Sequence, residues 1–121
     1  MLALIDANVI LRHLLGDHEQ MSATATEIIR AGAQTTPEVM AEVVYVLKGV
    51  YKVPLEEISS VLLDFLDSVF MEEKAEVMLA LKLFGEASLD FVDCLLIARN
   101  RISGIPVFTF DKKMNSYLKP K

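Results

Sequence analysis

The sequence predicts an α/β fold in which helices cover both faces of a central parallel sheet. Short apolar runs alternate along the chain with longer segments that have helical periodicity. The short runs are apolar throughout rather than at every second position, which is typical of strands buried on both faces. With 121 residues, 53% of them hydrophobic, the chain has enough apolar side chains for one core, and we expect a single domain over residues 1–121.

The expected strands are short and widely spaced. They are the runs Leu2–Ile5, Ala33–Thr36, Val69–Met71 and Pro106–Phe110. Of these, Val69–Met71 has the weakest strand pattern. The long connections between the runs favour parallel pairing, because a parallel pair needs a crossover.

The expected helices begin and end at recognisable signals. In chain order they are Asn8–Leu15, Ser22–Ala31, Pro37 to about Lys48, Pro54 to Leu66, about Glu73 to Phe84, and one capped by Ser88 or Asp90 that ends near Ser103. Proline suits a first helical turn, which supports Pro37 and Pro54 as starts. Glycine follows the expected last residue of several helices, as at Gly49, Gly85 and Gly104.

Composition limits the location of the protein. No apolar run reaches about 18 residues, so we expect no transmembrane helix. The first residues lack a basic segment and meet Asp6 early, unlike a signal peptide. Cys94 is the single cysteine and excludes a disulfide within the chain, which fits the cytoplasm; its apolar surroundings favour a core residue over a nucleophile.

Four acidic residues lie in or directly after apolar runs, where a lone buried carboxylate is costly. They are Asp6, Glu42, Asp93 and Asp111. We expect them to be buried and to converge on a shared cation. Asp6 and Asp111 directly follow strands, and sites in parallel sheets form beyond the carboxyl ends of strands. Asp93 falls in the first turn of its helix and Glu42 in the second, so all are reachable from one edge of the sheet.

Such a cluster favours a hard divalent ion. Two carboxylates about 4 Å apart repel by roughly 4 kcal/mol at an effective dielectric near 20. Oxygen ligands select Mg²⁺ or Mn²⁺ over zinc, and neither His13 nor His18 is spaced for a zinc site, so both are expected at the surface. The natural reaction class for such a site is phosphodiester hydrolysis.

Each acid also has a purely structural interpretation. Asp6 suits an N-cap, Glu42 suits a solvent-facing position on its helix, and Asp111 suits a turn. Asp90 is interpreted as a helix cap in preference to a metal ligand. Asp93 is too embedded among apolar residues for capping alone to explain it.

The net charge of −5 argues against a nucleic-acid partner only at first sight. Five of the seventeen acids are those of the predicted site, counting Asp90, and the remaining twelve balance the twelve Lys and Arg residues. Basic residues lie in pairs near the acids in the sequence: Lys48 and Lys52, Arg99 and Arg101, Lys112 and Lys113, Lys119 and Lys121. These pairs are weak support for a phosphate-bearing partner.

The chain also resembles a known family. Four segments together are similar to the motifs of PIN-domain nucleases: Leu4–Leu11, Ala41–Leu47, Leu89–Ala98 and Phe108–Asp111. Their order and spacing match over nearly the whole chain, whose length is that of VapC-type toxins.

The resemblance implies a three-layer α/β/α sandwich and an endoribonuclease that depends on Mg²⁺ or Mn²⁺. By position, Asp6, Glu42, Asp93 and Asp111 match the acidic quartet of the family, with Asp6 and Asp93 as direct ligands of the first ion. Asn8 and Thr109 match supporting positions, and Asp90 ranks below the quartet. The resemblance further implies a cytoplasmic homodimer silenced by a cognate antitoxin, with RNA as substrate.

Two other functions stay open at this point. The same fold without catalysis would be a metal-stabilised module that binds RNA or protein. A phosphotransferase with Asp6 as nucleophile is weaker, because Asn8 stands where such enzymes usually carry a second Asp.

Overall fold

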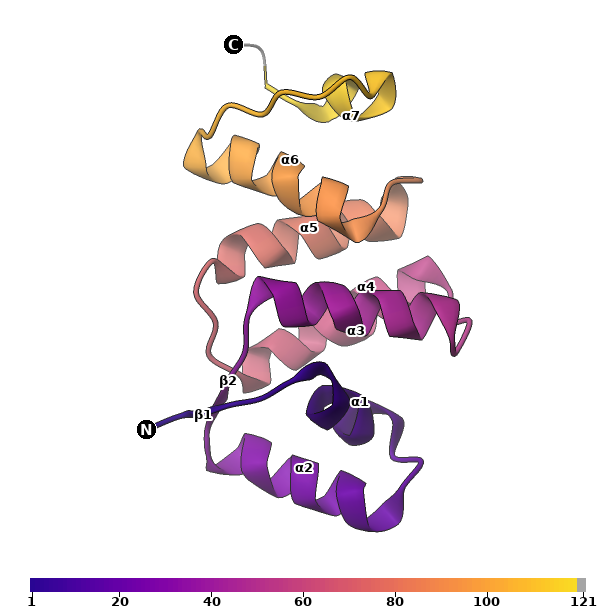
Figure 1. Ribbon diagram of the computed structural model, residues 1–121, viewed down its shortest axis with the longest axis vertical. Helices are drawn as coiled ribbons and strands as arrows, with labels where there is room; N and C mark the ends of the chain where they lie inside the picture. The colour runs from indigo at the N-terminus through magenta and orange to yellow at the C-terminus, as the bar shows by residue number, and fades with distance from the viewer. Residues whose placement is uncertain (120–121) are drawn as a thin grey trace.

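The protein is an elongated stack of helices with a small sheet near one end, as a computed structural model of the chain shows (Figure 1). The structure describes residues 1–119, so Lys121 of the last basic pair lies outside the described residues. The elements are β1 (Ala3–Leu4), α1 (Ala7–Leu15), α2 (Glu19–Ala31), β2 (Ala33–Gln34), α3 (Pro37–Gly49), α4 (Leu55–Phe65), the 3₁₀ turn η1 (Leu66–Ser68), α5 (Lys74–Glu86), α6 (Phe91–Ser103) and α7 (Lys112–Tyr117).

The sheet is parallel, as predicted. Ala3 pairs with Ala33 and Leu4 with Gln34. The amide of Ile5 donates to the carbonyl oxygen of Gln34 at 2.9 Å, which extends the ladder by one bond. Gln34 also forms a parallel bridge to Phe70 on its other side, so β1 is an outer strand of the described sheet. The α/β class is therefore confirmed.

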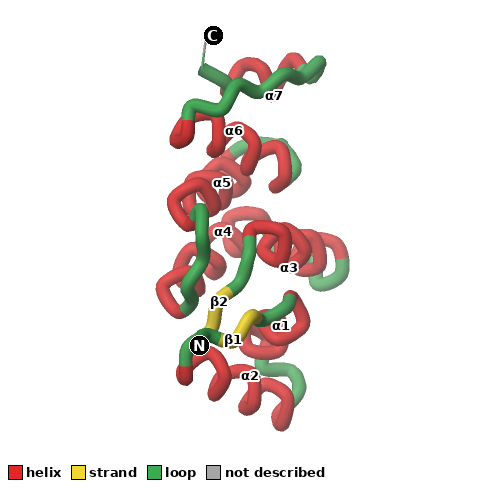
Figure 2. The backbone as a smooth tube through the Cα atoms, turned by 60° about the vertical axis from the view of Figure 1, so that its left-hand side comes forward, coloured by secondary structure: helices red, strands yellow, loops and turns green. Residues whose placement is uncertain are grey.

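The sheet is smaller than predicted. Val69–Met71 contributes only the bridge at Phe70. The predicted strand Pro106–Phe110 pairs with no strand among residues 1–119. The reason is that this segment runs along α6, where the side-chain amide of Asn100 donates to the carbonyl oxygen of Ile105 at 3.0 Å. In Figures 1 and 2 it lies at the opposite end of the stack from β1. The molecule described here is mostly helical, and the three-layer sandwich stays a prediction.

Most helix boundaries follow the predicted signals. Gly16 and Gly104 take left-handed conformations directly after α1 and α6, with φ of 60° and 71°. Helix α2 begins earlier than predicted, because the His18 side chain accepts the amide of Met21 and caps the helix at Glu19. Helix α7 was not predicted.

Gly85 does not end a helix, contrary to the prediction. It lies within α5, where a Cβ atom would come 2.9 Å from the Cβ of Ser59 on α4. The glycine therefore allows α4 and α5 to approach closely, and a steric requirement rather than a stop signal explains it.

The core runs through the stack as one apolar cluster. Its largest fully buried side chains come from α1, α3, α4, η1, α5 and α6: Ile10, Met40, Val43, Ile58, Leu62, Leu66, Val77, Leu81, Phe84, Cys94 and Ile97. Phe84 of α5 meets Phe91 of α6 edge to face at 6.2 Å between ring centroids. Among residues 1–119, no helix is long and apolar enough to cross a membrane.

We predict that Gly85→Ala destabilises the protein. The added methyl group would overlap Ser59, and overpacking of this kind costs about 1–3 kcal/mol, more than the gain of roughly 1 kcal/mol in helix propensity. Urea unfolding followed by circular dichroism measures the difference. Gly49→Ala is the matched control, because no atom lies within 4 Å of a Cβ at this position of α3, so it should be neutral or stabilising. Equal stability of the two variants would contradict the steric role of Gly85.

Candidate functional site

Three aspartates gather around the start of α6. Asp90 is the N-cap residue of α6, Asp93 lies in its first turn, and Asp111 is the N-cap residue of α7. Burial raises the pKa of the Asp93 carboxyl, and the negative charges of Asp90 and then Asp111 raise it further. Asp93 therefore interacts electrostatically with both of the other aspartates.

Hydrogen bonds hold Asp111 in place. Its Oδ1 accepts the amide of Met114 at 3.0 Å and caps α7, so Asp111 is a helix cap and not a turn residue at the end of a strand. The Oγ1 of Thr109 accepts the amide of Asp111 at 3.1 Å, and the Asn115 side chain donates to the Thr109 carbonyl oxygen at 2.9 Å. Thr109 thus closes a local turn before Asp111, and its supporting role at the site stays a prediction.

Asp6 and Glu42 come from the other half of the stack. The Oδ1 of Asp6 accepts the amide of Val9 at 3.0 Å and caps α1, so the structural interpretation holds for this residue too. Glu42 is exposed on α3. Asn8 lines a separate cavity of about 440 Å³ beside α1 and α2, together with His18.

The expected burial of the quartet is wrong. Asp6, Glu42 and Asp111 are exposed, and only Asp93 is partly buried. Two of them cap helices at the surface, and Glu42 faces away from the core, so apolar neighbours in sequence do not enclose them. Within residues 1–119, no group of three or more His, Cys, Asp or Glu side chains is arranged to hold a metal ion. One chain therefore does not assemble the quartet as a metal cage, and its role stays a prediction.

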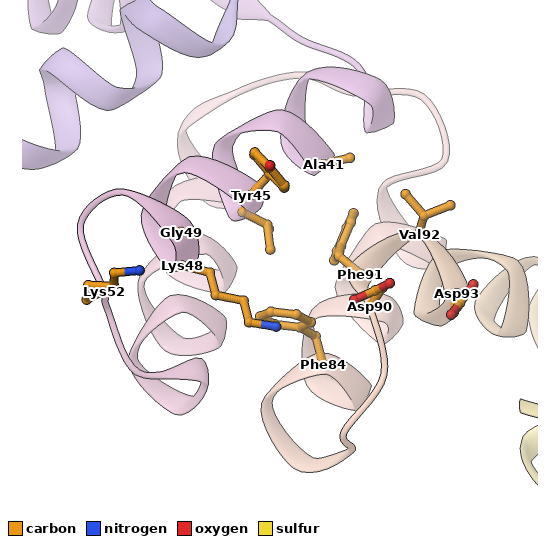
Figure 3. A pocket seen from close by; sticks show the side chains of 11 residues that line it. Ala41, Tyr45, Lys48, Gly49, Lys52, Phe84, Asp90, Phe91, Val92 and Asp93 are labelled. Carbon is orange, nitrogen blue, oxygen red and sulfur yellow. The ribbon is translucent and has the colours of Figure 1, made fainter. Parts of the chain in front are cut away.

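A cavity of about 680 Å³ adjoins Asp90 and Asp93 (Figure 3). Helix α3 and the loop after it line one side with Tyr45, Lys48 and Lys52. The start of α6 lines the other side with the two aspartates. The cavity thus places amino groups opposite carboxylates.

An aromatic surface accompanies these charges. Tyr45 is 76% exposed at the cavity, and Lys48 Nζ lies 6.0 Å from the centroid of the Phe84 ring. Sequence reasoning noted Lys48 and Lys52 only as a basic pair and missed Tyr45. Residues 41, 45 and 48 line this cavity and are spaced as one face of α3, which is the signal that was available, and Lys52 joins them from the loop after α3.

The remaining metal-binding and nucleophilic residue types are structural. Cys94 is fully buried, as predicted, and burial, followed by the charges of Asp93 and Asp90, raises the pKa of its thiol to about 11. His18 is exposed and caps α2. His13, predicted at the surface, is partly buried, and its Nδ1 lies 2.8 Å from Thr26 Oγ1.

The chain belongs to the PIN domain family, whose model matches residues 3–119. The PIN domain is generally a nuclease fold, and PIN nucleases typically use divalent metal ions. No curated protein and no solved structure matches the chain significantly.

We predict that Cys94 does not react with a thiol reagent in the native protein. At pH 8 a thiol with a pKa of about 11 is neutral, and its sulfur is closed to solvent. Absorbance after addition of an aromatic disulfide reagent measures the reaction, with urea-unfolded protein as the reactive control. Fast modification of the folded protein would show that Cys94 is accessible and not a core residue.

Proposed function

We propose that this protein is a divalent-metal-dependent endoribonuclease that hydrolyses RNA phosphodiester bonds as the toxin of a type II toxin–antitoxin pair. Membership of a family of nucleases supports the reaction class. The observation that carries the proposal is the cavity that places Lys48 and Lys52 opposite Asp90 and Asp93. Cationic side chains would bind the phosphate backbone beside the acids that act on it.

The cavity has the features of a single-strand binding surface. Lysine ammonium groups contact phosphates without regard to sequence, and exposed aromatic rings such as Tyr45 stack on unpaired bases. In this cavity, Lys48 and Lys52 locally offset the overall negative charge of the chain. We therefore propose single-stranded or looped RNA as the substrate class.

The proposed ion is Mg²⁺ or Mn²⁺. Carboxylate oxygens are the donor type that these ions prefer. Burial, and then repulsion by Asp90 and Asp111, raises the pKa of Asp93, and a cation would relieve that repulsion. We propose Asp6 and Asp93 as its direct ligands, with Glu42 and Asp111 completing the quartet, Asn8 and Thr109 in support, and Asp90 in a secondary role. Such an ion, when bound, activates water and stabilises charge on the phosphate.

The remaining parts of the proposal follow from the type of protein. A cytoplasmic toxin would be silenced by a cognate antitoxin that covers the cavity, and it would act as a homodimer of single domains spanning residues 1–121. The complete fold would be the three-layer sandwich of the family. The competing function is a non-catalytic RNA- or protein-binding module, which the separation of Asp6 from the other acids favours. Such a module would bind RNA without cutting it.

We predict that the purified protein cleaves RNA with Mn²⁺, stops with EDTA, and loses roughly a hundredfold or more of its rate in Asp6→Asn. Asparagine caps a helix as well as aspartate does, so α1 should keep its start while the charge is lost. Gel analysis of a labelled RNA gives the rate. Asp64→Asn, an exposed position on α4, is the matched control and should cleave like the wild type. Binding without cleavage in the wild type would favour the binding module instead.

We also predict that Lys48→Gln and Lys52→Gln weaken RNA binding. Each lysine that contacts a phosphate contributes about 0.7 to the slope of log affinity against log salt concentration for a single strand, so each variant should lower that slope. Fluorescence anisotropy in EDTA, across a salt series, measures binding without cleavage. Lys82→Gln changes an exposed lysine of α5 outside the cavity and should leave the slope unchanged. A slope that all three variants lower equally would assign binding to overall charge instead of to this cavity.

A further inference from the structure

The carboxylate of Asp90 is exposed at the cavity and unused by the fold. Asp90 is the N-cap residue of α6 by position, but its side chain makes no cap hydrogen bond, whereas those of Asp6 and Asp111 do. Among residues 1–119, its carboxylate takes part in no hydrogen bond or ion pair. It lines the cavity between α3 and α6 instead (Figure 3). A carboxylate without a partner in the fold is available to a ligand.

The cavity has room for a flat aromatic ligand beside this carboxylate. Its volume of about 680 Å³ lies within the range of small-molecule sites. Val44, Phe84 and Phe91 contribute apolar surface to its lining. Tyr45 adds a side chain that is 76% exposed. Apolar and aromatic surface binds the face of a ring, and a polar group at the margin binds its edge, so the cavity offers both kinds of contact.

The chemistry of a carboxylate restricts which nucleobase it can bind by two hydrogen bonds. An ionised carboxylate accepts hydrogen bonds and donates none. Single-stranded RNA exposes the Watson–Crick edges of its bases. Of the four standard bases, guanine alone has two neighbouring donors on that edge, the ring N–H and the exocyclic amine. Each of the other three bases would place an acceptor atom against one carboxylate oxygen.

We propose that the cavity binds a guanine base of single-stranded RNA, with the Tyr45 ring stacked on the base and both Asp90 oxygens accepting its Watson–Crick donors. This selectivity rests on the nuclease function proposed above, to which it adds a preferred base. Asp93 follows Asp90 within one turn of α6, so a guanine held by Asp90 would lie next to the bond that is cut. The protein would therefore cut beside guanosine.

The lysines across the cavity disfavour a competing ligand. A guanidinium group also presents two neighbouring donors to a carboxylate. It carries a positive charge, which Lys48 and Lys52 would repel, whereas a guanine base is neutral and its phosphate would be attracted. Charge complementarity therefore favours a nucleotide over an arginine side chain of a protein.

The lysine wall of the cavity is held in place by its backbone. Lys52 has a left-handed conformation, with φ of 55°, which is uncommon for a residue with a side chain. The amide of Val53 donates to the carbonyl oxygen of Leu47 at 2.9 Å and ties the loop back to α3. A fixed phosphate contact on this wall and the carboxylate on the other would together determine which nucleotide reaches Asp90.

Binding of short RNA oligomers in EDTA tests the selectivity without cleavage. The oligomers are polyuridine with one central guanosine, adenosine or inosine, labelled for fluorescence anisotropy. We expect the guanosine oligomer to bind roughly tenfold more tightly than the adenosine oligomer. Inosine keeps the ring N–H but lacks the exocyclic amine, so its oligomer should bind with an affinity between these two. Equal affinity for guanosine and inosine, or for guanosine and adenosine, would overturn the proposal.

Asp90→Asn separates base recognition from charge repulsion. Asparagine suits an N-cap position, so α6 should keep its start. With base recognition, the variant loses the roughly tenfold preference for guanosine over adenosine. A carboxylate that only repels phosphate would leave this ratio unchanged while every oligomer bound the variant more tightly, and that result would overturn the proposal. Glu86→Gln changes an exposed acid at the end of α5, outside the cavity lining, and as the matched control it should keep the preference.

Tyr45→Ser tests the stacking contact. Stacking tolerates any base, so the variant should bind the guanosine and adenosine oligomers more weakly by a similar factor of roughly ten. Val50→Ser, 67% exposed directly after α3 and outside the lining, should bind like the wild type. Unchanged affinity in folded Tyr45→Ser would overturn the stacking contact. Far-ultraviolet circular dichroism confirms folding, and the inosine comparison uses the wild type, so it stays decisive if a variant fails to fold.

Cleavage with Mn²⁺ distinguishes failure of this subsite from failure of the nuclease function. Cleavage by a protein that binds guanosine and adenosine oligomers equally would overturn the subsite alone. Guanosine-selective binding without cleavage would support the subsite and overturn the nuclease function alone. Absence of binding to every oligomer would overturn the subsite, and the cleavage assay would still decide the nuclease function.

Discussion

The packing of α6 on α5 determines where the functional groups of this protein lie. The close approach of α4 and α5 at Gly85 and the edge-to-face contact between Phe84 and Phe91 build a continuous stack from α4 to α6. This stack holds the start of α6, with Asp90 and Asp93, beside the end of α3. The same stack keeps the segment after α6 away from β1. The cavity and the open edge of β1 therefore both result from the packing of α6 on α5.

Helix capping gives the acids their orientation. Asp6 and Asp111 each use one carboxylate oxygen to accept a helical amide, which leaves the second oxygen outside the cap. Both capping carboxylates are exposed because they lie where a helix meets a loop. Capping and ligation are thus compatible roles for one aspartate. Burial first, and then repulsion by Asp90 and Asp111, raises the pKa of Asp93, and a cation would offset both effects.

The division of charge across the cavity explains how an acidic protein would bind an anionic polymer. Lys48 and Lys52 stand on one wall, and the aspartates stand on the other. Screening in salt solution limits the interactions of surface charges to about 10 Å, so a phosphate in the cavity would interact with these lysines more than with acids outside the cavity. In the proposed function, the local arrangement of charge would decide RNA binding more than net charge does.

The sequence by itself determined six of the helices, α1 to α6, the parallel pairing and the family. Glycines at Gly16 and Gly104 and proline at Pro37 act on the backbone locally, so their signals need no tertiary context. Only the tertiary structure decided which side chains are enclosed and which strands pair. Glu42 lies among apolar residues in sequence, yet the helical repeat turns it to solvent while Val43 faces the core. The segment Pro106–Phe110 had the composition of a strand. A strand forms only when a partner edge is within reach, and the packing of α6 on α5 keeps this segment away from the edge of β1 in its own chain.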